Sequence, residues 1–307
     1  MHFGFDDIFG RHFFEKTDNC ILLPWVGSKR SLIGQISNYY PKTVNNYYEP
    51  FCGSLSVGLD VMSKFGKKGS SVAFNDYNST LIDLYRSLSS DSSYDEMLDA
   101  LNQLHDDFFK LTDESEKEQY YLERRKEFNQ NLDKSGPRKS ALFYFLIKAG
   151  FQQMSRFNSK GEFNTPYGRG KHFNLDYDKL EDFHRTFNGA TFTSGDFESF
   201  IRSQNPGSGD FVYFDPPYDE TFSGYTSASF GPRDQERLSD LVHELVSKGC
   251  YCLVSNNRTE LIEDLYSDFD IVDITRQNKF QRVGNNKEKT VTECLVVAKN
   301  INRKKLY

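Results

Sequence analysis

The chain has 307 residues, of which 37% are hydrophobic and 27% charged, and its formal net charge is −6. This length suits one large domain or one domain with a smaller one inserted, and the composition is that of a folded globular protein. No run approaches 18 apolar residues, and the N-terminus lacks a basic region followed by an apolar core. We therefore expect neither a membrane-spanning helix nor a secretory signal, which favours the cytoplasm.

Five cysteines and six histidines are scattered without the spacing of metal ligands. We expect reduced thiols in the core and no metal centre. The negative net charge argues mildly against a nucleic-acid-binding protein, but the charge is unevenly placed. Residues 156–171 hold four Arg or Lys and one acid, whereas residues 91–119 hold ten acids and two lysines. The first stretch is a candidate basic surface, and the second is expected to be a solvated helical face turned away from DNA.

Strands and helices alternate in the first part of the chain. The expected order is a loop at 24–30, a helix from Ser31, a strand and turn at 46–53, a helix at 54–65, a strand at 71–76 and a helix at 80–88 capped by Asn78 or Ser79. This alternation is the pattern of a doubly wound α/β sheet.

The pattern changes near residue 90 and changes back near residue 177. Residues 91–150 have helical spacing, with an apolar helix at 141–149, and residues 151–175 suit an irregular hairpin. The expected later elements are strands at 191–193, 211–214 and 250–255, helices at 235–247 and 258–268, and a closing hairpin of 271–275 with 291–298. We predict a mostly parallel sheet with a terminal antiparallel hairpin, formed by 1–88 and 177–307 and interrupted by a helical subdomain at 89–176.

The run Phe211–Tyr218 carries the strongest signal. Its apolar and aromatic start predicts a buried parallel strand, and Asp215, Pro216, Pro217 and Tyr218 follow it. Prolines cannot continue a strand ladder, so the chain must turn out of the sheet there. Since ligands bind at the carboxyl edge of such sheets, Asp215 and Tyr218 are candidate active-site residues. The alternative is an ordinary Pro-Pro turn after a strand.

A second candidate site lies where the first strand meets its helix. Residues Glu49–Gly53 form that turn, and Gly53 permits close approach of a ligand to backbone amides. Asp76 ends the next strand 23 residues after Gly53, where an acid commonly binds ribose hydroxyls. Because the turn lacks the three-glycine dinucleotide fingerprint, we expect a nucleoside-bearing cofactor other than a nicotinamide.

Seven segments, in one order, resemble the Dam-like (D12 class) adenine-N6 DNA methyltransferases. They are Trp25-Val-Gly-Ser-Lys29, Glu49-Pro-Phe-Cys-Gly53, Asp76-Tyr-Asn78 with Leu81 and Tyr85, the hairpin segment from Arg156 to Arg169, Gly195-Asp-Phe197, Asp215-Pro-Pro-Tyr218 and Ser255-Asn-Asn257. The resemblance covers about residues 24–298. One four-residue motif is a weak signal, but this ordered set is specific.

The resemblance implies a reaction and a role for each matching position. The methyl donor would be S-adenosylmethionine (SAM), with S-adenosylhomocysteine as product and no metal, and the substrate would be an adenine flipped out of duplex DNA. The catalytic set would be Asp215, Pro216, Pro217 and Tyr218: the Asp215 carboxylate and the Pro216 carbonyl would accept hydrogen bonds from the adenine amine, and Tyr218 would stack on the base. The implied cofactor-binding residues are Trp25, Gly27, Ser28, Lys29, Pro50, Phe51, Cys52, Gly53, Asp76, Asp196 and Phe197. Asp196 has a second possible role as the cap of the following helix.

The resemblance also implies that residues 148–171 bind DNA. The candidate residues are Lys148, Phe151, Gln152, Met154, Arg156, Asn158, Asn164, Pro166 and Arg169. The arginines can bind guanine or phosphates, the asparagines can read bases or shape the hairpin, and Pro166 can touch a thymine methyl or shape the turn. Phe151 and Gln152 can fill the gap left by a flipped base, or Phe151 can simply pack in the core. Ser28, Lys148 and Phe151–Met154 depart from the family's usual residues, which leaves the target sequence open.

Two other functions stay open. One is methylation of another planar amine, such as cytosine N4, RNA adenine or a glutamine side chain, and the other is a catalytically silent DNA-binding relative. Asp215 before two prolines, with Asp76 and Tyr218 intact, favours the adenine-specific DNA enzyme. Its expected partners are double-stranded DNA and, where one accompanies it, a cognate restriction endonuclease. We expect a monomer or weak dimer in the cytoplasm of a bacterial or phage-infected cell, with no membrane partner.

Overall fold

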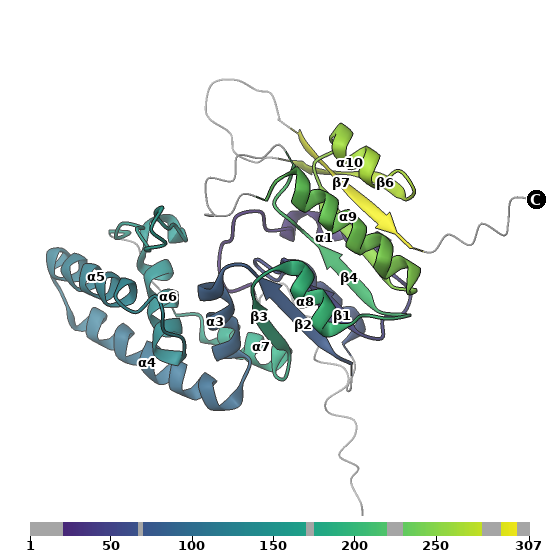
Figure 1. Ribbon diagram of the computed structural model, residues 1–307. Coiled ribbons are helices and arrows are strands. Elements are labelled where there is room, and N and C mark those ends of the chain that lie inside the picture. The colour runs from purple at the N-terminus through teal and green to yellow at the C-terminus, as the bar shows by residue number, and fades with distance from the viewer. Residues whose placement is uncertain (1–20, 67–69, 170–174, 220–229, 278–289, 300–307) are drawn as a thin grey trace, which may run out of the picture. The chain divides into compact units, whose positions relative to one another are not determined.

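The computed structural model describes residues 21–66, 70–169, 175–219, 230–277 and 290–299. A seven-stranded sheet runs in the order β3-β2-β1-β4-β5-β7-β6 (Figure 1). The strands are β1 (Tyr47–Glu49), β2 (Val72–Asp76), β3 (Thr191–Ser194), β4 (Phe211–Phe214), β5 (Tyr251–Asn256), β6 (Asp270–Gln277) and β7 (Thr290–Ala298). β1 is parallel to β2 and β4, and β4 to β5, whereas β7 is antiparallel to β5 and β6. The predicted mostly parallel sheet with a closing antiparallel hairpin is confirmed.

The chain divides by its contacts into two units. Of the described residues, the first unit contains 21–28, 53–66, 78–169 and 175–194, and the second contains 29–52, 70–77, 195–219, 230–277 and 290–299. Helices of the first unit are α2 (Ser56–Phe65), α3 (Ser79–Leu88), α4 (Asp91–Lys110), α5 (Glu114–Asn129), α6 (Pro137–Ala149) and α7 (Tyr177–Phe187); those of the second are α1 (Ile33–Ile36), α8 (Phe197–Gln204), α9 (Pro232–Ser247) and α10 (Glu260–Leu265). The predicted subdomain at 89–176 lies within the first unit, and its functional role stays a prediction.

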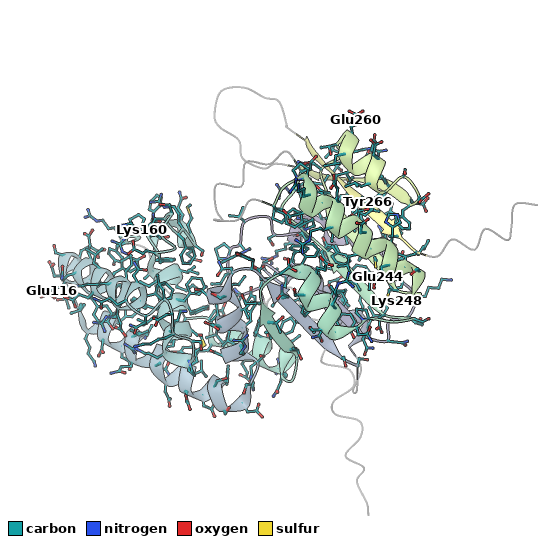
Figure 2. All side chains as sticks on the ribbon, in the orientation of Figure 1. Glu116, Lys160, Glu244, Lys248, Glu260 and Tyr266 are labelled. Carbon is teal, nitrogen blue, oxygen red and sulfur yellow. The ribbon has the colours of Figure 1, made fainter. Side chains whose placement is uncertain are left out.

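The second unit has its core beneath α8 and α9. Alternate residues of a strand point to one face, so Val212 and Phe214 of β4 pack with Phe200 of α8 and Leu241 of α9. The intervening residue of β4, Tyr213, is equally buried on the other face. A strand covered on both faces shows a continuous apolar run rather than alternation, which is why β4 was readable from the sequence. Glu244, in the last turn of α9, and Lys248, directly after that helix, are labelled in Figure 2.

The first unit is a bundle of helices with aromatic side chains between them. Helix α4 buries Met97, Leu101, Leu104 and Phe108 at helical spacing and exposes its acids, so the predicted solvated face is confirmed for this helix. Phe108 lies edge-on to Phe145 of α6, with ring centroids 5.7 Å apart. Charged side chains such as Glu116 and Lys160 project from the surface of this unit (Figure 2).

Some helices differ from the sequence expectations. Helix α6 begins at Pro137 rather than at residue 141, because proline suits the first helical turn and Gly136 precedes it with φ +121°. The helix expected from Ser31 is only a short segment, a 3₁₀ turn (Arg30–Leu32) followed by α1. Helix α10 is shorter than 258–268 at both ends, and it starts after Thr259 because that side chain caps it. Helix α7 was not predicted, although its buried residues have helical spacing.

Candidate active site

Asp215 lies directly after β4, at the carboxyl edge of the sheet. Its Oδ1 is 2.9 Å from Lys29 Nζ, and only 18% of its side chain and 6% of the Lys29 side chain are exposed. Burial raises the pKa of Asp215, and the ion pair with Lys29 offsets only part of that effect. Lys29, predicted to hold the cofactor, therefore also contacts the motif assigned to the target base.

Amide side chains of two other elements hold the turn that follows Asp215. Gln235 Nε2 donates to the Pro217 carbonyl at 3.1 Å, and Asn256 Nδ2 donates to Gln235 Oε1 at 3.0 Å. Asn256 Oδ1 accepts the Asp219 backbone N–H at 3.0 Å, and Asn257 Nδ2 donates to the Asp219 carbonyl at 2.9 Å. The turn is thus held by hydrogen bonds within the protein, which is the condition for electrostatic preorganisation. The asparagines belong to a segment singled out in the sequence, whereas Gln235 was missed.

Asn75 joins the two backbone turns predicted to hold the cofactor. Its Nδ2 donates to the carbonyls of Pro50 and Gly195, both at 3.0 Å. Its own carbonyl accepts the Cys52 N–H at 2.8 Å, and the Gly195 N–H lies 3.3 Å from the Asp76 carbonyl. The structure therefore brings the Pro50 turn, Asp76 and Gly195 together at the carboxyl ends of β1 and β2. Asn75 was missed because, in the sequence, it is only an amide before Asp76.

The aromatic residues of these turns lie close together. The rings of Phe51 and Phe197 are 5.3 Å apart between centroids. Cys52 is buried, and burial raises the pKa of its thiol, so the side chain stays neutral. These contacts give the predicted cofactor-binding region an apolar wall next to Asp76 and Asp196.

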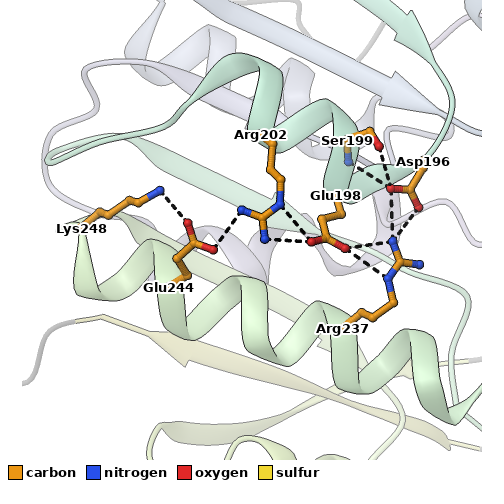
Figure 3. Close-up of polar contacts among 7 residues, drawn as sticks. All are labelled: Asp196, Glu198, Ser199, Arg202, Arg237, Glu244 and Lys248. Carbon is orange, nitrogen blue, oxygen red and sulfur yellow. Dashed lines mark hydrogen bonds and ion pairs between the residues drawn. The ribbon is translucent and has the colours of Figure 1, made fainter.

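Asp196 does cap the helix after it, since its Oδ1 accepts the Ser199 N–H at 3.0 Å. Arg237 of α9 adds an ion pair with Asp196 at 3.1 Å and one with Glu198 at 3.0 Å, and its guanidinium lies 5.0 Å from the centre of the Phe197 ring. Burial alone would raise the pKa of Asp196, but the bonds from Ser199 and Arg237 lower it. Figure 3 shows the network continuing through Arg202, Glu244 and Lys248.

Hydrogen bonds between serine hydroxyls join the loop that contains Trp25 and Ser28 to the start of α2. Ser28 Oγ lies 2.8 Å from Ser56 Oγ and 3.0 Å from Ser54 Oγ, and the latter two hydroxyls are 2.7 Å apart. Gly53 has φ +43°, and a Cβ there would lie 3.4 Å from the Trp25 ring. The hydroxyl of Ser28, a departure from the family pattern, thus closes a ring of three hydroxyls. Gly27, with φ +79°, makes the turn between Trp25 and Ser28.

Residues 25–280 match the family model described as D12 class N6 adenine-specific DNA methyltransferase. The chain belongs to this family. It is 33% identical to the Type II methyltransferase M1.LlaDCHI of Lactococcus lactis subsp. cremoris, over 89% of this chain and 93% of that relative. It is 31% identical to the Type II methyltransferase M.MjaIII of Methanocaldococcus jannaschii (90% and 97% covered) and 30% identical to the Retron Ec67 DNA adenine methylase of Escherichia coli (81% and 81%). The predicted family and the adenine-specific DNA methyltransferase activity are confirmed.

Among solved structures, the rRNA methyltransferase aviRa of Streptomyces viridochromogenes matches 94% of this chain and 95% of that chain, with 11% identity and a TM-score of 0.37.

The hairpin predicted to bind DNA in this methyltransferase is present and is mounted on α5. Bridges join Gly150 to Tyr167 and Phe157 to Phe163. Asn129 of α5 donates to the Phe163 carbonyl at 3.0 Å and accepts its N–H at 2.8 Å. These two bonds between the Asn129 side chain and the Phe163 backbone attach the hairpin to α5.

The polar candidates of the hairpin differ in their contacts. Asn158 Oδ1 accepts the N–H groups of Lys160 and Glu162 at 2.9 and 3.0 Å, which is the pattern of a turn residue. Asn164 Oδ1 accepts Arg156 Nε at 2.9 Å and so orients an exposed guanidinium. Arg169 is paired with Glu118 of α5 at 2.6 Å.

The remaining candidates lie where the hairpin joins α6. Phe151 and Met154 are 47% and 39% exposed, so the core-packing alternative for Phe151 is excluded. Gln152 has a left-handed backbone, with φ +54°. The Pro166 carbonyl accepts the Phe151 N–H at 2.8 Å, and this bond joins the two ends of the hairpin. Burial lowers the pKa of Lys148.

Within the described ranges, no group of three or more His, Cys, Asp and Glu side chains is placed to hold a metal ion. No helix in that part of the chain is long and apolar enough to cross a bilayer. Cys52, Cys250, Cys252 and Cys294 are buried free thiols, as predicted, and Cys20 lies outside the described residues.

Proposed function

We propose that the enzyme transfers the methyl group of SAM to N6 of an adenine flipped out of double-stranded DNA. The position of Asp215 carries this proposal. It is a largely buried carboxylate at the end of β4, the parallel neighbour of β1. Because carboxyl ends of adjacent parallel strands meet at one edge, Asp215 and the turn after β1 are neighbours there. The turn after β4 would bind the target amine, and the turn after β1 would bind the methyl donor.

The chemistry asks mainly for positioning. The adenine amine is a poor nucleophile because its lone pair is conjugated with the ring, while the sulfonium of SAM supplies an activated methyl. Asp215 and the Pro216 carbonyl would accept hydrogen bonds from the two N–H groups of the amine and favour a tetrahedral nitrogen with its lone pair toward the methyl. As the N–C bond forms, the S–C bond would break, S-adenosylhomocysteine would leave, and the nitrogen would release one of its two protons to solvent. Gln235 and Asn256 fix the turn that carries these acceptors. Tyr218 would stack on the flipped base.

We propose that the cofactor lies along the turns that Asn75 joins. Asp76 would bind the ribose hydroxyls, and Asp196 with Phe197 would hold the adenine. The Pro50–Gly53 turn would contact the methionine moiety, and the Trp25–Lys29 loop would complete the site. The contacts of Asn75 and Arg237 support this arrangement because they fix the backbone and side chains involved.

We further propose that residues 1–88 and 177–307 form the catalytic domain. The inserted subdomain at 89–176 would bind DNA through its hairpin. The exposed Arg156, Phe151 and Met154 support this proposal. The proposed assembly is a monomer or a weak dimer. A restriction endonuclease is the candidate partner, since two relatives are named as Type II methyltransferases. The DNA substrate would place the enzyme in the cytoplasm.

A transfer assay tests the reaction. Purified enzyme is incubated with methyl-labelled SAM and a chelator in parallel reactions that contain duplex DNA, RNA or a protein mixture, and the labelled DNA is digested to nucleosides. We expect the label in N6-methyladenine. Label in N4-methylcytosine, or in RNA or protein but not DNA, would establish the other amine substrates, and no label with intact DNA binding would indicate a silent relative.

We predict that Arg237→Ala weakens SAM binding by about two- to tenfold, the loss expected for one exposed ion pair and one cation–π contact. Arg237 orients Asp196 and covers the Phe197 ring. Arg202→Ala is the matched control, because Arg202 shares Glu198 with Arg237 but contacts neither adenine-site residue. Calorimetry should show wild-type affinity in the control, and equal losses in both variants would mean that the network acts only on stability.

A further inference from the structure

Glu293 is a second buried carboxylate at the catalytic edge, and it lies beyond the segment that matches the family model, which ends at residue 280. It is 5% exposed and lies near the start of β7. Since β7 runs antiparallel to β5, with Cys294 opposite Asn256, the start of β7 meets the carboxyl end of β5. The closing hairpin therefore delivers a carboxylate to the edge where Asp215 lies.

The contacts of Glu293 join it to the catalytic motif. Its Oε2 accepts the Tyr218 hydroxyl at 2.6 Å and lies 3.8 Å from Lys29 Nζ. Lys29 Nζ is 2.9 Å from Asp215 and 4.8 Å from the centre of the Tyr218 ring. The four side chains form one cluster in which two carboxylates share one ammonium group.

We propose that Glu293 is a positioning residue for methyl transfer, because it holds the Tyr218 hydroxyl and shares Lys29 with Asp215. The inference rests on the proposed function, in which Tyr218 stacks on the flipped base and Asp215 accepts its amine. A hydrogen bond to a charged acceptor is short and strong, so it fixes the plane of the ring against which the base would stack. The ammonium of Lys29, held between the carboxylates, in turn fixes the Asp215 rotamer.

The charge of Glu293 also acts on Asp215. Burial raises the pKa of Asp215, the ammonium of Lys29 lowers it, and the negative charge of Glu293 raises it further. Outside this cluster, the buried hydroxyl of Tyr213 on β4 also interacts with the charge of Asp215. Below its pKa, Asp215 is protonated and loses acceptor capacity, so turnover falls on the acid side. Removing the charge of Glu293 lowers that pKa, and the acid limb of the rate profile moves to lower pH.

Four variants and a control test the proposal by single-turnover methylation, SAM calorimetry and thermal unfolding. Glu293→Ala should slow methyl transfer by about ten- to a hundredfold, the usual cost of a small misplacement at a reacting centre, with SAM affinity within about threefold of wild type. Glu293→Gln keeps an acceptor for the Tyr218 hydroxyl, so it should recover most of the rate and shift the acid limb downward. Asp273→Asn is the control, because Asp273 is an exposed carboxylate of the same hairpin, paired with Arg258.

A double-mutant cycle separates positioning from a general loss of structure. If Glu293 acts through the Tyr218 hydroxyl, the variant carrying both Tyr218→Phe and Glu293→Ala should be no slower than the slower single variant. Three results would overturn the proposal. They are a wild-type methylation rate in Glu293→Ala, rate losses that multiply in the double variant, and an acid limb of the pH profile that does not move in Glu293→Gln. The reaction itself is judged on the wild-type enzyme, so an inactive wild type would refute the proposed function instead.

Discussion

Asp215→Ala is expected to abolish DNA methylation and to leave SAM binding intact. Removal of one preorganised electrostatic group commonly costs about 10²–10³-fold in turnover, and Asp215 is the proposed acceptor for the target amine. The variant should fold, because Lys29 keeps a second carboxylate, Glu293, at 3.8 Å. Asp215→Asn, which keeps the size but not the charge, should lie between the wild type and the alanine variant.

Asp76→Ala is the matched variant at the neighbouring strand end. Its loss should weaken SAM binding by about ten- to a hundredfold, since hydrogen bonds to a charged group contribute about 1.5–3 kcal/mol. Titration calorimetry with SAM and single-turnover methylation at saturating SAM separate the two effects. Equal loss of SAM affinity in the Asp215 and Asp76 variants would refute the proposed division between target and cofactor.

The parts of the fold that could be predicted are those whose signal is local. Strand β4 was found at its observed bounds because a buried strand shows a continuous apolar run and the two prolines end it. The closing hairpin was predicted from its two strands, but its place in the sheet was not. The sequence does not say that β7 pairs with β5 and leaves β6 at the edge, because that choice depends on which strand edge is open after the sheet has formed.

The candidate site shows the same limit. The motif residues could be predicted because turn prolines, turn glycines and acids at strand ends are recognisable from the neighbouring sequence alone. Their partners were not, because Lys29 with Asp215 and Tyr218 with Glu293 are pairs far apart in the chain. Asn75, a single buried amide, carries no pattern at all. Local sequence thus predicts which residues lie at the reacting centre, whereas their partners are known only from the tertiary structure.

Arg156→Ala is expected to weaken binding to the cognate DNA by about 1–3 kcal/mol and to relax specificity at one base pair. This is the usual loss for a guanidinium that binds guanine through two nitrogens. Asn164 holds Nε of Arg156, which sets the plane of the exposed group and favours reading over a loose phosphate contact. Competition binding against a set of single-base variants of the target measures both quantities, and SAM affinity should not change.

Arg169→Ala should behave differently, because Arg169 is paired with Glu118 and must leave that partner to bind DNA. A surface ion pair is weak, so exchange for a phosphate is feasible, and a phosphate contact carries no sequence information. We expect an equal, smaller loss on all sequences and a salt slope shallower by about one. Lys110→Ala, at the exposed end of α4, controls for the loss of one positive charge. Wild-type affinity and salt slope in both arginine variants would move DNA recognition away from this hairpin, whereas a sequence-dependent loss in Arg169→Ala alone would exchange the two roles.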